Sequence, residues 1–242
     1  MVLRQLQRLL TLPPDVSLEV ADRRAGGKDE LVRHAAAFLL PVGGSVIVLR
    51  DLDDFTPDQA VEWFEGQLRV EFGPKVPGLT LRRVDAVGPQ PAVYALSDGT
   101  HSGWAALVLV GSPPAQALVT EYGIERFAVD DYLLLLAKDE ATYAGMSEHR
   151  EVGFGVAFRK LKRFAELMRE NQVAVCDSKR LLKLLQGITG FRASPATYAE
   201  RLIEGARGAH GDHWLRQHFN PLAEAMEAAV RALAARWATG GG

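Results

Sequence analysis

The chain has 242 residues, of which 48% are hydrophobic and 24% are charged, and this composition predicts one large globular domain or two small ones. Its formal net charge of −2 excludes a globally basic nucleic-acid-binding protein, so such binding would need a local patch. The single cysteine, Cys176, excludes an internal disulfide and a cysteine-rich zinc site. No apolar run reaches about 18 residues, and no signal-peptide pattern opens the chain. We therefore expect a cytoplasmic protein without a membrane partner.

The first third of the chain alternates between helical and strand patterns. The predicted elements are a helix over 2–12, a strand over 16–20, a helix over 28–40, a strand over 46–49 and a helix over 56–72. Pro13 and Pro14 end the first helix, whereas Thr56 and Pro57 form the N-cap and first turn of the third. Alternation of this kind predicts an α/β fold with a parallel sheet and right-handed crossovers.

The rest of the chain changes character near residue 111. Residues 79–84 and 92–96 predict a hairpin, and 105–110 predict another buried strand. Beyond these, helices are predicted from 112, over 127–146, 154–171 and 177–188, from 194, and over 220–237. We therefore expect an α/β domain over 1–111 and a mostly helical region over 112–242 that packs on it.

Three carboxylates follow the predicted strand over 46–49. Arg50 is followed by Asp51, Asp53 and Asp54, immediately before the helix that Thr56 caps. In open α/β sheets, ligands bind at the carboxyl ends of the strands. Crowded carboxylates repel one another unless a cation or a proton neutralises them, and Mg²⁺ prefers such oxygen ligands. The alternative interpretation is a solvated acidic turn in front of a helix.

This order of elements resembles the Toprim domain, the metal-binding α/β module of topoisomerases, primases and OLD-type nucleases. The family's D-x-D motif corresponds to Asp51 and Asp53, with Asp54 just beyond, and the stretch GGKDELVRHAAAFL is similar to the preceding helix in small OLD-like proteins. The resemblance covers roughly residues 1–111 and implies a Toprim-like parallel sheet flanked by helices. It further implies Mg²⁺ or Mn²⁺ bound by these aspartates, and nuclease or other phosphotransfer chemistry on DNA or RNA.

One part of the family pattern has no counterpart. Toprim proteins carry a glutamate after their first strand, whereas this chain opens inside the helix that should follow that strand. Glu19 and Glu30 fall on other predicted elements. Either this member is truncated before its first helix, which we expect, or the resemblance is false. Without the glutamate, we expect weak metal binding and weak or no cleavage.

Lys179 is the candidate catalytic residue of the helical region. It follows Asp177, the predicted N-cap of a helix, and its charge would neutralise a phosphate; the alternative is a solvated lysine beside a simple cap. Asp130 and Asp131 are expected in a helix's first turn, where acids are common for dipole reasons, with metal binding as the alternative. His210 and His213, with Asp212 between them, are expected in a surface loop, with a metal site as the alternative. The basic stretch over 159–163 is expected to be a solvated face, with nucleic-acid binding as the alternative.

Three functions stay open from the sequence. The first is a Toprim-like, Mg²⁺-dependent nuclease or phosphotransfer enzyme. The second is a non-catalytic Toprim-like module that binds nucleic acid or a protein partner such as an ATPase, since the chain has no phosphate-binding P-loop of its own. The third is an unrelated α/β protein in which the acidic turn is structural.

Overall fold

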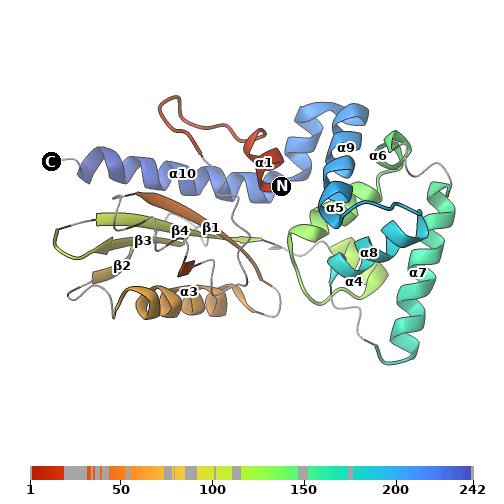
Figure 1. The fold of residues 1–242 in the computed structure, drawn as a ribbon, viewed down its shortest axis with the longest axis horizontal. Coiled ribbons are helices and arrows are strands. Elements are labelled where there is room, and N and C mark those ends of the chain that lie inside the picture. The colour runs from red at the N-terminus through yellow and green to blue at the C-terminus, as the bar shows by residue number, and fades with distance from the viewer. Residues whose placement is uncertain are drawn as a thin grey trace. The chain divides into compact units, whose positions relative to one another are not determined.

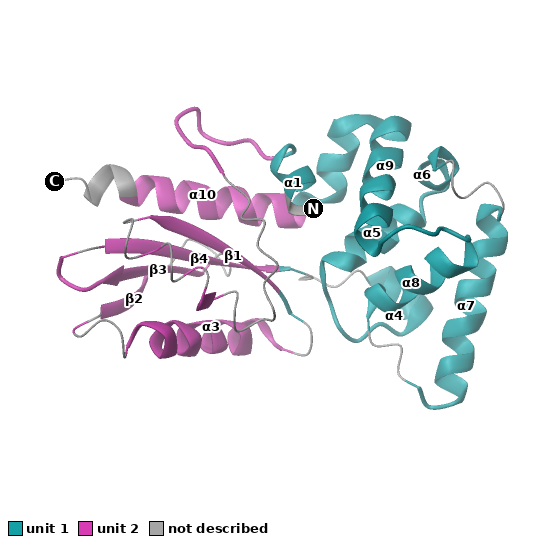
Figure 2. Cartoon of the chain, viewed as in Figure 1, with its two compact units in different colours: residues 1–9, 51–54, 110–220 teal, residues 10–50, 55–109, 221–242 magenta. Residues whose placement is uncertain are grey.

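The structure is a computed structural model, and it divides the chain into two compact units (Figure 2). Unit 1 comprises residues 1–9, 51–54 and 110–220, and unit 2 comprises 10–50, 55–109 and 221–242. The residues that the structure describes are 2–18, 32, 33, 35, 39, 44–52, 55–73, 78, 80–84, 92–100, 102–110, 116–146, 152–173 and 177–240.

Unit 2 is built on a four-stranded sheet with the strand order β1-β4-β3-β2. The strands are β1 (Ser45–Asp51), β2 (Thr80–Val84), β3 (Ala92–Ser97) and β4 (Ser102–Val110). The predicted hairpin is confirmed, because β2 and β3 pair antiparallel with Thr80 opposite Ser97. β3 and β4 also pair antiparallel, with Ser97 opposite Ser102.

Strand β1 runs parallel to β4. The Trp104 N–H donates to the Gly44 carbonyl at one end of the pair, and the Leu52 N–H donates to the Val110 carbonyl at the other, each over 3.2 Å. The described sheet is therefore mixed, and the parallel arrangement expected from the sequence holds for this one pair. The α/β class and the flanking helices are confirmed. The carboxyl ends of β1 and β4 lie at the same edge of the sheet, which is the edge that Asp51 occupies.

Two helices cover the faces of this sheet, α3 (Pro57–Phe72) on one side and α10 (Asn220–Gly240) on the other (Figure 1). On the α3 side, the rings of Phe64 and Tyr94 meet edge to face at 5.4 Å, and both side chains are fully buried. On the α10 side, the Arg236 guanidinium lies 5.9 Å from the centre of the Trp104 ring. Alternate residues of the strands therefore face the two helices.

Helix α3 forms where the sequence predicts it. The Thr56 side chain accepts from the Gln59 N–H, and the Gln59 side chain accepts from the Thr56 N–H, so the two residues form a capping box. Pro57 occupies the first helical position, where its missing N–H removes no helical hydrogen bond.

The elements predicted over residues 2–40 are shorter than expected or lie partly outside the described residues. Residues 16–18 form no strand, and 19–20 lie outside the described residues. The first helix, α1 (Val2–Gln7), ends earlier than the leucine spacing predicts, with residues 8 and 9 in a turn. Most of the predicted helix over 28–40 also lies outside the described residues. Positions 32, 33, 35 and 39 are helical, and Val32, Ala35 and Leu39 are buried.

Unit 1 is helical. Besides α1, its helices are α4 (Gln116–Tyr122), α5 (Val129–Ala137), α6 (Glu140–Gly145), α7 (Phe154–Glu170), α8 (Ser178–Ile188) and α9 (Pro195–His218). Helix α5 packs on α8 and α9, and α8 also packs on α7 (Figure 1). Asp177 and Ser194 cap α8 and α9 as predicted.

Two expectations for unit 1 are wrong. The single helix predicted over 127–146 is two helices, because Asp139 turns away from the first helix and caps the second by accepting from the N–H and hydroxyl of Thr142. His210 and His213 lie in α9 instead of a surface loop. The helix kinks at Gly211 between them, where φ is 81° and ψ is 172°. His210 is held at the kink by Asp139, with 2.6 Å between Nε2 and Oδ1.

Among the described residues, no helix is both long enough and apolar enough to cross a membrane.

Candidate functional site

Asp51 is the last residue of β1, and it lies beside the start of helix α5. Its carboxylate is half-buried, and Oδ1 accepts a hydrogen bond from the Val129 N–H over 2.9 Å. Val129 is the first residue of α5, so its N–H has no partner within the helix. The carboxylate also complements the positive end of the helix dipole. The end of the strand and the beginning of the helix are thereby joined through one aspartate.

Asp131 joins the same end of α5 to the beginning of α8. Its side chain is only 4% exposed, and both carboxylate oxygens accept hydrogen bonds. Oδ2 accepts from the Ala128 N–H over 3.0 Å, and Oδ1 accepts from the hydroxyl of the fully buried Ser178 over 2.5 Å. Burial raises the pKa of Asp131, and these hydrogen bonds oppose the rise. Asp131 therefore fixes the relative position of two helix starts.

Asp130 is brought next to Asp51 by this arrangement. Burial raises the pKa of Asp130 to about 6, the negative charge of Asp51 adds to the rise, and the positive charge of Lys179 opposes it. Asp131 and Asp177 raise the pKa further. Asp130 is thus a half-buried carboxyl, and both its burial and the negative charge of the surrounding acids oppose its ionisation. We name Asp51, Asp130 and Lys179 the acidic cluster.

Lys179 is the cation of the acidic cluster. It is the second residue of α8, and its side chain is exposed. The helix begins here because Asp177 accepts from the Arg180 N–H over 2.8 Å, and Asp177 also forms an isolated parallel bridge with Arg126. Since α8 begins against α5, Lys179 lies where its charge acts on Asp130.

Two of the three aspartates singled out in the sequence, Asp53 and Asp54, lie outside the described residues. Among the residues that are described, no three His, Cys, Asp or Glu side chains converge closely enough to hold a metal ion. The donors of the acidic cluster are carboxylate oxygens, which suit Mg²⁺ or Mn²⁺, and Mg²⁺ keeps several waters and needs only one or two protein carboxylates. The chemistry of Asp51 and Asp130 therefore fits such an ion.

Sequence reasoning gave too little weight to Asp130. Paired acids in a helix's first turn are common for dipole reasons, so the pattern of Asp130 and Asp131 carries no sign of a site. The clue in the sequence is the hydrophobic stretch YLLLLA that follows the two acids. It predicts a largely buried helix, and the first turn of such a helix is buried as well. That Asp130 faces Asp51, 79 positions earlier, could not be read from local patterns.

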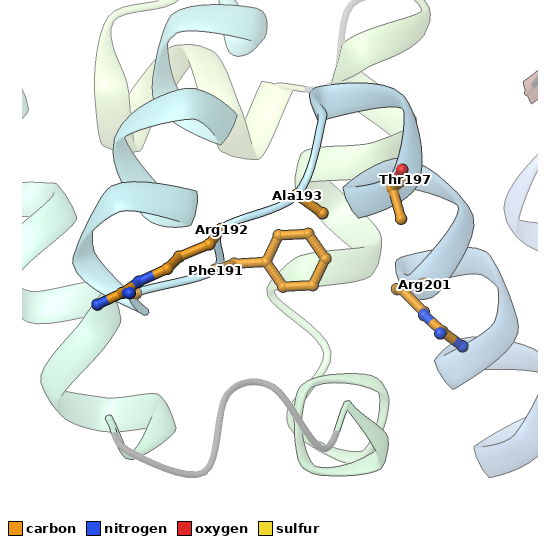
Figure 3. Close-up of a pocket in the computed structure, with 6 residues that line it drawn as sticks. Phe191, Arg192, Ala193, Thr197 and Arg201 are labelled. Atoms are coloured by element: carbon orange, nitrogen blue, oxygen red, sulfur yellow. The ribbon is translucent and has the colours of Figure 1, made fainter.

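A surface pocket of about 320 Å³ lies elsewhere in unit 1, between the end of α8 and the start of α9. The ring of Phe191 forms its floor, and Arg192 and Arg201 line it. Figure 3 shows the two guanidinium groups pointing away from each other, and Arg201 is paired with Glu204 over 3.1 Å. Its charged groups therefore do not converge on a common ligand.

Comparisons with known proteins add no relative: no protein-family model matches this sequence, no curated protein matches it, and no solved structure matches its fold.

Proposed function

We propose that the protein is a Toprim-like, divalent-metal-dependent nuclease or phosphotransfer protein that acts on nucleic acid at the acidic cluster. Asp51 and Asp130 would hold Mg²⁺ or Mn²⁺, together with Asp53 and Asp54, and Lys179 would neutralise a phosphate. The observation that carries the proposal is that Asp51, at the carboxyl end of β1, is hydrogen-bonded to the start of α5, where burial and the charge of Asp51 raise the pKa of Asp130. A divalent cation relieves the repulsion between these two carboxylates and favours the ionised form of both groups.

The roles of the residues follow from where they lie. Asp51 is fixed at the end of β1 by the Val129 N–H, which donates to its Oδ1 over 2.9 Å. The Asp131–Ser178 hydrogen bond holds the start of α8 against α5, and the positive charge of Lys179 in the first turn of α8 lowers the pKa of Asp130. A bound metal would supply Lewis-acid activation of water and charge stabilisation on a phosphodiester. The protein's own contribution would be to hold carboxylates for the metal ion and a lysine for the phosphate within one region of unit 1.

Metal-induced thermal stabilisation tests the site. We expect Mg²⁺ or Mn²⁺ to raise the melting temperature, because a ligand that binds only the native state at about 100 times its Kd stabilises by about 2.7 kcal/mol. The increase should be much smaller in Asp51→Asn and Asp130→Asn. Glu125→Gln is a matched control, since Glu125 is an exposed acid in the same unit, just before α5. The quantity compared is the metal-induced change, because removing a repelling carboxylate stabilises the protein without metal.

Cleavage of a labelled oligonucleotide with Mg²⁺ or Mn²⁺ tests the chemistry. Activity lost in Asp51→Asn and retained in Glu125→Gln would support the proposal. Equal metal-induced shifts in the native protein and in both aspartate variants would refute the metal site.

The hydrogen bond from Val129 to Asp51 favours a second candidate, in which the acidic turn only joins β1 to α5. Asp51→Asn keeps an acceptor oxygen for this N–H and removes the charge, whereas Asp51→Ala removes both. If the role is only structural, Asp51→Asn is as stable as the native protein and metal has no effect on either. Asp51→Ala then costs about 1 to 3 kcal/mol.

A further inference from the structure

Helix α7 carries cations and large apolar side chains together on its solvent side. Its inner side is the fully buried row Ala157, Leu161 and Ala165. Six large apolar side chains of the described residues are exposed, and half of them belong to this one helix: Val156, Phe164 and Leu167. Arg159 and Lys160 are exposed among them. The basic stretch is solvated, as the sequence predicts, but the exposed apolar side chains among its cations distinguish this face from one that is polar throughout.

The positive charge of α7 and its neighbour α8 is not balanced locally. Residues 154–188 contain eight Lys and Arg against three Asp and Glu, a net charge of +5, while the whole chain is at −2. Arg163 pairs with Glu166 and Glu170, at 3.5 Å and 3.1 Å. Within the described part of the chain, no carboxylate lies within ion-pair distance of Arg159 or Lys160. These charges suit a polyanion.

The positive charge continues from α7 towards the acidic cluster. Helix α8 packs against α7 and, at its start, against α5. Lys179 and Lys183 are exposed and four positions apart, so they lie on the same side of α8. Lys179 belongs to the acidic cluster, and Lys183 stands one helical turn further along.

We infer that Arg159, Lys160 and Phe164 of α7, with Lys183 of α8, bind a single strand of nucleic acid whose backbone continues to the acidic cluster. We name these four residues the strand-binding surface. The inference rests on the proposed function, since it names the polymer whose phosphodiester that cluster would meet.

The exposed ring of Phe164 selects a single strand over a duplex. Phe164 is 41% exposed and follows Lys160 by four positions, so ring and cation are neighbours on the helix. Unpaired bases stack on such rings while adjacent cations hold the phosphates. In a duplex both faces of each base are already stacked on neighbouring bases, so the Phe164 ring cannot stack on them. An acidic protein segment would need the cations but not an aromatic ring.

Fluorescence anisotropy with a labelled oligo(dT), in EDTA, tests the surface without depending on metal chemistry. We compare the native protein with Arg159→Gln/Lys160→Gln and with Arg82→Gln/Arg83→Gln. The second pair removes the same charge from two exposed positions of β2. The α7 pair should weaken binding about tenfold or more near 0.1 M salt and lower the slope of log K against log[salt] by about 1.4, at about 0.7 for each cation. The β2 pair should bind as the native protein does.

Two ring variants test the stacking. Phe164→Leu removes the ring and keeps an apolar side chain, so it should weaken binding at least about fivefold, whereas Phe164→Tyr keeps the ring and should bind as the native protein does. Equal binding by Phe164→Leu and the native protein, tighter binding to duplex DNA, or equally strong competition by poly-L-glutamate would each overturn the inference. So would equal weakening by the α7 and β2 charge pairs.

Asp51→Asn separates this inference from the proposed function. It should bind oligo(dT) in EDTA at least as well as the native protein, because it removes a negative charge and leaves the strand-binding surface intact. Strand binding by the native protein without metal-dependent cleavage would refute the proposed chemistry and leave the surface standing. Metal-dependent cleavage by the native protein, together with unchanged oligo(dT) binding by Arg159→Gln/Lys160→Gln, would refute the strand-binding surface and leave the proposed chemistry standing.

Discussion

At the scale of single residues, the molecule's distinctive feature is that its carboxylates at the start of α5 have different roles. Asp131 is buried and accepts two hydrogen bonds, so it acts structurally. Asp130, its neighbour, is half-buried and resists ionisation because of burial and the charge of Asp51. The difference follows from their partners, since Asp131 accepts a hydrogen bond from Ser178 of α8, whereas burial and the charge of Asp51 oppose the ionisation of Asp130.

The raised pKa of Asp130 predicts a specific pH dependence of stability. The pKa is about 6 in the folded protein and about 3.9 in an unfolded chain, so the native state holds this proton more tightly. The contribution to stability is fully present below about pH 4 and is lost as the pH rises through about 6. Asp130→Asn is neutral at every pH. It should therefore match the native protein near pH 4 and exceed its free energy of unfolding by about 3 kcal/mol at pH 8.

Urea unfolding at several pH values measures this difference. Glu125→Gln, which changes an exposed acid of the same unit, is the control. A difference for Asp130→Asn that does not change between pH 4 and pH 8 would mean that Asp130 ionises as an ordinary surface acid.

At the scale of secondary-structure elements, local chemistry determines the boundaries of the helices. Thr56, Asp177 and Ser194 each cap the helix that the sequence predicts at that position. Asp139 and Thr142 form the same kind of cap, which the strong periodicity of the leucines before them concealed. The arrangement of β1 beside β4 could not be predicted in the same way, because strand pairing depends on contacts between distant residues.

The kink of α9 predicts opposite effects for two glycines three positions apart. Gly211 has a φ of 81° and a ψ of 172°, a conformation that residues with a Cβ rarely adopt, so Gly211→Ala should destabilise by about 1 to 3 kcal/mol. Gly208 lies in regular helix, and an added Cβ meets no atom within 4 Å. Gly208→Ala should stabilise by about 0.5 to 1 kcal/mol. Thermal unfolding of both variants checks the pair, and destabilisation of equal size would contradict the role of backbone strain at Gly211.

At the scale of the whole molecule, each compact unit is assembled from three separate stretches of the chain. Sequence composition suggests a division near residue 111, where strand patterns give way to helical ones. The structure nevertheless groups the last helix, from residue 221, with the sheet, and it groups residues 51–54 with the helices. These assignments depend on packing between distant residues, which an amphipathic pattern does not specify, because it shows that a face is buried but not what covers it.

This organisation predicts that unit 2 requires α10. The helix contributes buried side chains at Leu222, Met226 and Leu233, and Glu227 accepts from the Thr11 N–H over 2.7 Å. A chain ending at Asn220 should lose protection from hydrogen exchange in β3 and β4 and keep it in α5 and α9, since those helices belong to unit 1. Arg231→Ala, at an exposed position of α10, is the control. Unchanged protection of the strands after truncation would show that the sheet is stable without this cover.

The stacking at the kink of α9 also makes the two units separately visible to spectroscopy. Of the four tryptophans in the sequence, Trp214 belongs to unit 1, whereas Trp63, Trp104 and Trp237 belong to unit 2. The Trp214 ring is stacked on His210 at 4.2 Å and on His218 at 5.4 Å. Both stacks require the folded α9, so the emission of Trp214 changes when the helix unfolds and the stacks open. Emission from a protein that retains only Trp214 therefore follows the unfolding of unit 1 alone.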